Sequence, residues 1–242
     1  MMKNTQIVLV FFLLTTLGFS QDRTIKNADN KYNDLSYMDA VDVYTKVAEK
    51  GHGTQEIYQR LGNSYYFNGD YVNASKWYSK LLEEGNTSDI DSEYYYRYSQ
   101  TLKTVNNLKE SNRYFELFSK QKPSDPRSSL FANAKNYLEE LKKVSNRYSI
   151  EDANVNTEFS DYGGAFYDGS LVFTSSRKNS GLSKRIHSWT DQSFSKLYRS
   201  TINSSGGLEK VELLDKSLDT KFNEATAVFT NDGKGPGHKT VD

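Results

Sequence analysis

The 242-residue sequence contains no cysteine, three prolines and no net charge. The absence of cysteine excludes disulfide scaffolds, thiol nucleophiles, cysteine-ligated zinc, iron–sulfur clusters and the lipid-modified cysteine of a bacterial lipoprotein. With 31 basic and 31 acidic residues, the chain lacks the excess positive charge of duplex-DNA-binding and membrane-surface proteins. We therefore expect no nucleic-acid partner.

Long apolar runs are also lacking, apart from Ile7–Leu17 near the start. This run follows Lys3 and precedes the small residues Gly18 and Ser20, which is the order of a secretory signal peptide. It is shorter than the ~20 residues that span a bilayer as a helix, so residues 1–20 are predicted to be cleaved rather than to anchor the chain. We expect an exported protein of the bacterial periplasm, with or without outer-membrane association, and no membrane span after cleavage.

Glycine is scarce in the first part of the mature chain and frequent in the second. Residues 21–147 contain 5 of the 15 glycines and 14 of the 18 tyrosines, whereas residues 148–242 contain 9 glycines and 4 tyrosines. The first composition favours helices and the second favours strands joined by turns. The predicted domains are therefore a helical one at 21–147 and an all-β one at 148–242.

A repeat of 34 residues runs through the helical part. Tyr37, Ala40 and Tyr44 recur as Tyr71, Ala74 and Tyr78. A further shift of 37 leads to Leu108, Ser111 and Phe115, so a third copy is longer by three residues, which we place around 87–90. The period predicts a solenoid of helix pairs. It resembles the tetratricopeptide repeat (TPR), most closely in the middle copy at 58–82.

Small residues at Gly62 and Ala74 are predicted to let the paired helices approach closely, while buried aromatics fill the gaps between repeats. Asn68–Asp70 form a turn, and Asp125 with Pro126 begins a closing helix that runs to about Val144 and covers the last repeat. The five aromatics predicted as core are Tyr44, Tyr65, Tyr78, Tyr98 and Phe115. The full set of structural repeat positions is Ala40, Tyr44, Gly62, Tyr65, Ala74, Tyr78, Ser99, Phe115 and Pro123.

In TPR proteins the first helix of each repeat lines a concave groove, and the resemblance transfers this role to two segments here. Glu56 and Gln59 stand where a clamp for a C-terminal carboxylate would need cations, so that ligand is disfavoured. The predicted partner-binding residues are Glu56, Gln59, Asn63, Tyr66, Phe67, Glu93, Tyr96, Gln100 and Lys103.

Alternating apolar residues flank Asp168-Gly169, a two-residue hairpin signal because both positions need positive φ. Further strands are predicted at 194–202 and 208–214. The segment 159–177 resembles a WD-like β-propeller repeat of the kind also found in the TolB translocation protein, with Asp161, Phe166, Asp168 and Gly169 as its structural positions. The predicted fold class is thus α+β multidomain, an all-α TPR solenoid followed by an incomplete all-β WD-like propeller.

A second copy of the strand motif begins at 223, with Asp161 aligned to Glu224 and Phe166 to Phe229, an offset of 63. No apolar return strand is expected after Asp232-Gly233, so the chain would encode about one and a half blades. Since propellers use 4 to 8 blades, we expect a truncated or diverged end.

The order of signal peptide, TPRs, closing helix and WD-like blades resembles OmpA-family cell-envelope proteins of bacteria with type IX secretion and gliding motility. This resemblance implies an exported protein–protein interaction scaffold with partners in the cell envelope. Two alternatives stay open: the non-catalytic N-terminal region of a larger propeller-containing peptidase or hydrolase, and a peptide or glycan capture module.

Catalytic motifs are absent from the sequence. The three histidines have no ligand-spaced partners, and no His-Glu-x-x-His, EF-hand, P-loop, Gly-x-Ser-x-Gly or dinucleotide-binding pattern occurs. We therefore predict a non-enzymatic protein with no cofactor and no metal site.

Overall fold

The computed structural model describes residues 23–84, 89–133, 137–178, 185–230 and 236–241. The predicted signal peptide, and residues 87 and 88 of the region 87–90 in which we placed the three-residue insertion, lie outside the described residues. The chain divides into a helical unit, which extends through Leu141, and a second unit, which holds the strands. Within the described ranges, no helix is long and apolar enough to cross a membrane.

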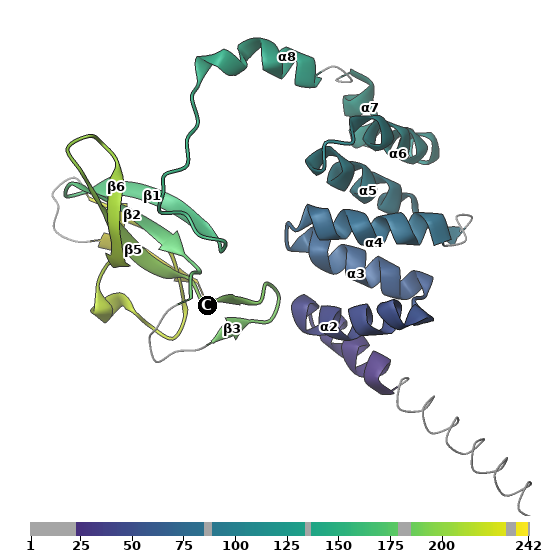
Figure 1. Cartoon of the computed structure of the whole chain (residues 1–242), viewed down its shortest axis with the longest axis horizontal. Helices are drawn as coiled ribbons and strands as arrows, with labels where there is room; N and C mark the ends of the chain where they lie inside the picture. Colours follow the sequence, from purple (N-terminus) through teal and green to yellow (C-terminus); the bar gives the residue numbers. More distant parts are fainter. Residues whose placement is uncertain (1–22, 85–88, 134–136, 179–184, 231–235, 242) are drawn as a thin grey trace, which may run out of the picture. The chain divides into compact units, whose positions relative to one another are not determined.

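The helical unit is a stack in which each helix from α2 to α7 packs on the next (Figure 1). The helix at 23–33 contacts α2 through Tyr32 and Asp29, and α3 pairs with α4 and α5 with α6, as the repeat predicts. The bounds are α2 (Tyr37–Val47) with its wider final turn η1 (Ala48–His52), α3 (Gln55–Phe67), α4 (Tyr71–Glu84), α5 (Ser92–Thr104), α6 (Leu108–Gln121), α7 (Pro126–Asn133) and α8 (Tyr137–Val144).

Small residues set the spacing within each helix pair. A Cβ added at Gly62 would lie 2.3 Å from the Tyr78 ring, so glycine is what lets α3 and α4 approach. In the next pair the equivalent residue is Ser99, whose carbonyl accepts a hydrogen bond of 2.8 Å from the Ser111 hydroxyl on α6. Ala40 and Ala74 are fully buried. The predicted small-residue contacts are confirmed.

The predicted turns and caps are also present. Gly69 has φ +74°, which ends α3, and the Asp70 carboxylate accepts the N–H of Asn73 at 3.1 Å. The Asp125 carboxylate accepts the N–H of Arg127 at 2.9 Å, and Pro126 opens α7. These side chains replace the hydrogen-bond partners that the first turn of a helix lacks.

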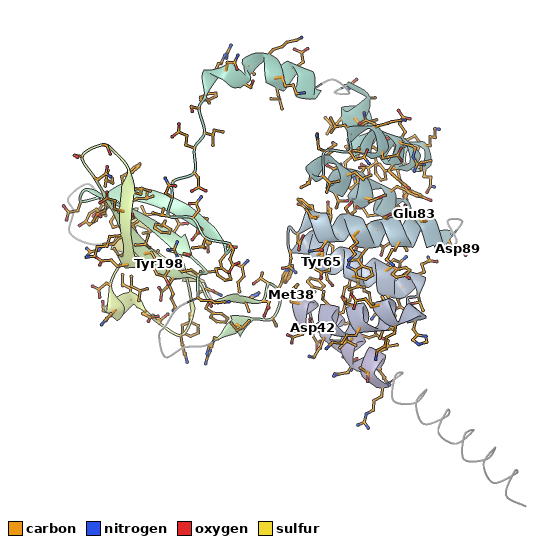
Figure 2. The ribbon with its side chains drawn as sticks, viewed as in Figure 1. Met38, Asp42, Tyr65, Glu83, Asp89 and Tyr198 are labelled. Carbon is orange, nitrogen blue, oxygen red and sulfur yellow. The ribbon has the colours of Figure 1, made fainter. Side chains whose placement is uncertain are left out.

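The aromatic core agrees with the sequence except at Tyr65. Tyr44, Tyr78, Tyr98 and Phe115 are buried, whereas Tyr65 is half-buried. Figure 2 shows Tyr65 toward the same side of the helix stack as Met38 and Asp42 on α2, with Glu83 and Asp89 toward the other side. Tyr65 therefore lies at a flank of the core.

The closing helix is only partly as predicted. Phe131 on α7 stacks on Phe115 with ring centroids 4.2 Å apart and so covers the last repeat. Farther along the chain, Leu141 and Val144 of α8 are exposed. The prediction that the closing helix covers the last repeat as far as Val144 is therefore wrong for these last residues.

The second unit centres on a four-stranded antiparallel sheet of order β1-β2-β5-β6 (Figure 1). Asp168 and Gly169 have φ of +46° and +68° and form the predicted tight hairpin. The strands are β1 (Asp161–Tyr167), β2 (Ser170–Ser175), β3 (Ile186–His187), β4 (Gln192–Ser193), β5 (Lys196–Ile202), β6 (Leu208–Leu213), β7 (Asn223–Phe229) and β8 (Pro236–Val241), with one-turn helices η3 (Ser145–Arg147) and η4 (Lys216–Leu218). Across the described ranges the strands do not close into a propeller.

Two ion pairs hold the second unit together. Arg177 reaches Asp161 at 3.0 Å and lies over the rings of Phe173 and Tyr198 (Figure 2 labels Tyr198). Burial raises the pKa of Asp161, but hydrogen bonds from Ser175, Thr157 and Arg177 outweigh it, and the net effect is a lowered pKa.

The second ion pair joins β5 to β7. The Lys196 ammonium lies 3.1 Å from both the Glu224 and the Asp219 carboxylates, and the side chains of Lys196 and Glu224 are 5% and 2% exposed. Glu224 also accepts the backbone N–H of Thr220 at 2.8 Å. The charges of Lys196 and Glu224 are thus buried together with several hydrogen-bond partners.

A strand does return after Asp232-Gly233, although, as predicted, it is not an apolar one. β8 pairs antiparallel with β7, from Asn223 opposite Val241 to Phe229 opposite Pro236. The run Pro-Gly-His-Lys-Thr-Val is not apolar, but strand pairing uses backbone hydrogen bonds and does not require apolar side chains.

The repeat offset of 63 is also wrong by one residue. β1 has an irregularity between Tyr162 and Ala165, and β7 has the same irregularity between Glu224 and Ala227, an offset of 62. Phe229 therefore matches Tyr167, on which it stacks at 4.0 Å, rather than Phe166, which is 76% exposed. A shift of one residue moves a side chain to the opposite face of a strand.

A candidate partner-binding face

The nine predicted groove residues lie on two helices, α3 and α5, which are the first helices of the second and third repeats. Thr54 and Asp91 begin these helices, since their side chains accept the N–H groups of Ile57 and Glu93. We call the surface formed by the nine residues and the arginines between them the first-helix face. Glu56 and Phe67 are exposed, Asn63 is buried, and the six others are half-buried.

Asn63 is the centre of a hydrogen-bond network within the protein and is not exposed for contact with a partner protein. Its amide oxygen accepts from the Tyr78 hydroxyl at 2.9 Å and from Arg97 at 2.7 Å. Its amide nitrogen donates to the Tyr32 hydroxyl at 3.1 Å and to the Tyr94 hydroxyl at 3.4 Å. The network joins the helix at 23–33 to α3, α4 and α5. These partners occupy both ends of the amide, so the structure gives Asn63 a structural role.

Burial explains the state of the Tyr78 hydroxyl in this network. Burial is the largest cause of a strongly raised pKa at Tyr78, and the nearby Arg97 lowers it by less. The hydroxyl therefore stays protonated and donates a hydrogen bond to the amide oxygen of Asn63.

Sequence reasoning missed three arginines on this face. Arg60 and Arg97 occupy equivalent positions, 37 residues apart, and Arg127 comes from α7. Each is paired with a carboxylate: Arg60 with Asp29 and Glu56, Arg97 with Glu93 at 3.5 Å, and Arg127 with Glu93 and Asp125, both at 2.9 Å. The spacing of Arg60 and Arg97 was a signal that could have found these two.

Aromatic rings complete the arginine sites. The Arg97 guanidinium carbon lies 5.0 Å from the centroid of the Phe67 ring, and that of Arg127 lies 4.2 Å from the centroid of Tyr96. Hydrogen bonds to Asp125 and Glu93 raise the pKa of Arg127. These guanidinium groups are fixed between carboxylates and rings.

A pocket of about 220 Å³ opens at the α5 end of the face, between α5, α6 and α7. Its apolar lining comes from Tyr96, Phe115, Leu130 and Phe131, and its polar lining from Gln100, Lys103 and Arg127. Burial lowers the pKa of Lys103. Three predicted groove residues thus meet at a pocket that α7, a helix outside the repeats, completes.

Two solved structures match the chain at low similarity. The C-terminal part of a TPR repeat-containing protein from Cytophaga hutchinsonii is 18% identical with a TM-score of 0.40, and the match covers 54% of this chain and 54% of that one. The chain thus matches about half the length of that structure. PcrH in complex with the chaperone binding region of PopB is 17% identical with a TM-score of 0.35, covering 48% of this chain and 92% of PcrH. No family model and no curated protein matches the sequence.

The first-helix face presents aromatic rings and paired charges, and a pocket with apolar and polar lining adjoins it. Within the described ranges no group of three or more acidic or histidine side chains is placed to hold a metal ion.

Proposed function

We propose that the protein is an exported, non-enzymatic scaffold of the bacterial cell envelope that binds a partner protein through the first-helix face of its TPR-like repeats. The observation that carries the binding part is the arrangement of that face. Its hydrogen bonds and ion pairs hold the arginines in place, while Phe67 on the face and Leu130 at the adjoining pocket stay 41% and 66% exposed. Exposed apolar side chains on a rigid frame are typical anchors of protein interfaces.

The strand unit supplies a second surface in this proposal, as one WD-like blade followed by the start of the next. The four-stranded antiparallel β1-β2-β5-β6 sheet has the strand number of a propeller blade. Two further observations support the repeat: β1 and β7 share an irregularity at equivalent positions, and Tyr167 stacks on Phe229.

Export and envelope location rest on the sequence of residues 1–20 and on the order of the segments. They are tested by expressing the full chain and a form without residues 1–20 in the source bacterium and fractionating the cells. We expect the full chain in the periplasmic or outer-membrane fraction and the shortened form in the cytoplasm. Recovery of both forms from the cytoplasm would contradict export.

The binding part is tested by affinity capture from an envelope fraction. Phe67→Ser removes an exposed ring of the first-helix face, and Val72→Ser removes a comparably exposed apolar side chain, 61% exposed, from α4. We expect Phe67→Ser to lose the proteins that the wild type retains and Val72→Ser to keep them. Identical protein lists for all three forms would refute the assignment of the face. Tyr66 and Tyr96 are less suitable targets, because both rings pack against the core.

A further inference from the structure

The helical unit contains one polar arrangement twice. In the first pair of helices, the Asp29 carboxylate accepts hydrogen bonds from the Tyr44 hydroxyl at 2.7 Å and from Arg60 on the next helix, α3. In the second pair, the Asn63 amide oxygen accepts from the equivalent tyrosine at 2.9 Å and from the equivalent arginine at 2.7 Å. Each copy therefore joins an acceptor, a tyrosine hydroxyl and a guanidinium between neighbouring repeats.

In the third pair, phenylalanine replaces both donors. Gln100 lies 37 residues after Asn63 and takes the acceptor position, and Phe115 takes the position of the tyrosines. The arginine is the sixth residue of α3 and of α5, and the sixth residue of α7 is Phe131. Phe115 and Phe131 stack on each other at 4.2 Å. The pocket of about 220 Å³ lies at this third position, since all three residues line it.

Gln100 keeps the hydrogen-bonding chemistry of the acceptor position. It is half-buried, and its amide nitrogen donates to the Ser99 hydroxyl at 3.3 Å. Its amide oxygen is equivalent to the oxygens that accept from Tyr44 and Tyr78 in the first two pairs, whereas the Phe115 ring has no hydroxyl to donate. A hydroxyl brought into the pocket would therefore meet an acceptor of the kind that both other pairs use.

The size and the lining of the pocket favour one uncharged aromatic side chain. At about 220 Å³ it is smaller than the ~300–1,000 Å³ typical of small-molecule sites. Tyr96, Phe115 and Phe131 supply rings against which another ring can pack. Arg127 is already paired with two carboxylates, and the Lys103 ammonium lies 5.9 Å from the centroid of the Phe115 ring. These two cations would repel an arginine from a partner, and an uncharged ligand needs neither of them.

We propose that this pocket receives a tyrosine side chain of the partner protein, with its ring among the aromatic side chains of the lining and its hydroxyl donating to the amide oxygen of Gln100. The proposal rests on the proposed function and names the anchor residue of the partner. The partner would supply in the third pair the donor that Tyr44 and Tyr78 supply in the first two. Tyrosine is among the residues enriched at the centres of protein interfaces, because its ring is apolar and its hydroxyl forms a hydrogen bond.

The test is a selection with the full chain from random dodecapeptides that are acetylated at the N-terminus and amidated at the C-terminus. We expect tyrosine to be enriched over phenylalanine and over aliphatic residues. An enriched peptide is then titrated by fluorescence anisotropy beside a copy in which phenylalanine replaces the tyrosine. The phenylalanine copy is expected to bind about three- to tenfold more weakly, as for the loss of one hydrogen bond.

Three variants locate the tyrosine preference. Gln100→Leu is expected to bind the tyrosine peptide about three- to tenfold more weakly than the wild type and no better than the phenylalanine copy. Gln100→Glu keeps an acceptor, as Asp29 does in the first pair, and is expected to retain the preference. The control Gln121→Leu changes an exposed glutamine of α6 outside the lining and is expected to have no effect. Thermal unfolding of each variant checks that it is folded.

Three results would overturn the proposal: no enrichment of tyrosine by the wild type, equal binding of the tyrosine and phenylalanine peptides, or a tyrosine preference that Gln100→Leu keeps. Failure of the proposed function looks different. If the wild type retains envelope proteins that Phe67→Ser loses, but the peptide selection shows no tyrosine preference, the face binds a partner and the pocket inference is wrong. If Phe67→Ser and the wild type retain the same proteins, the proposed function itself is wrong.

Discussion

Replacing Asn63 by leucine tests the claim that this residue holds the repeats together. The change keeps the side-chain volume roughly the same and removes all four hydrogen bonds of the amide. The fully buried Tyr78 hydroxyl then loses its acceptor, which costs about 1–3 kcal/mol. Arg97 loses one contact but keeps Glu93, and its side chain is 21% exposed, so we assign it under about 1 kcal/mol. The free energy of unfolding is expected to fall by about 1–4 kcal/mol.

The assay is urea unfolding of the full chain followed by far-UV circular dichroism, which reports mainly on the helical unit. Gln59→Leu is the matched control, since Gln59 is half-buried one turn earlier on α3; we expect a change within about 0.5 kcal/mol. Asn63→Asp separates hydrogen bonding from packing. Its carboxylate can accept from the tyrosine hydroxyls and pair with Arg97, so we expect a loss of no more than about 1 kcal/mol. An Asn63→Leu midpoint equal to that of Gln59→Leu would refute the network argument.

Three further predictions concern packing and charge. Gly62→Ala is expected to destabilise the helical unit by about 1–2 kcal/mol in the same urea assay, because the overlap with the buried Tyr78 ring exceeds the helix-propensity gain of alanine; a stabilised protein would contradict this. Lys196→Met is expected to lower the free energy of unfolding of the strand unit by about 3–5 kcal/mol, because it leaves the Glu224 carboxylate buried without its cation. Hydrogen exchange of the β5 amides measures this loss. The double variant Lys196→Met with Glu224→Gln should recover part of it. Asp161 has a lowered pKa in the fold, so its contribution to stability is present above its unfolded pKa of about 3.9 and is lost as the pH falls through the folded value. Asp161→Asn should therefore make the stability of the strand unit fall less steeply at acid pH. An unchanged acid dependence would show that other groups determine it.

The helix pairs could be predicted because their determinants repeat along the chain. Gly62 and Ser99 recur at a shift of 37 residues, and so do Tyr78 and Phe115, so a slip of a few residues would break the packing of both helix pairs at once. The register of β7 could not be predicted in the same way. Phe166 and Tyr167 are both strand-forming aromatics, and the extra residues at the irregularity leave no mark in the apolar pattern, so offsets of 62 and 63 look alike in sequence.

The role of Asn63 was beyond sequence reasoning for a different reason. Its four partners come from three other helices. A polar residue on a first helix gives the same sequence pattern whether its amide binds a ligand or contacts a neighbouring repeat. The equivalence of Arg60 and Arg97 could have been predicted from the sequence, because the two residues are separated by the 37-residue shift. What could not be read from that shift is that Asp29 and Glu93 balance them, since those carboxylates lie 31 and 4 residues away.

The balance of charge along the first-helix face determines what kind of selectivity our proposal allows. Where Arg60, Arg97 and Arg127 are each paired with a carboxylate, a charged partner gains little, since every new contact must compete with an existing one. Selectivity along α3 would then come from shape and from rings such as Phe67. Binding of a partner should therefore depend only weakly on salt.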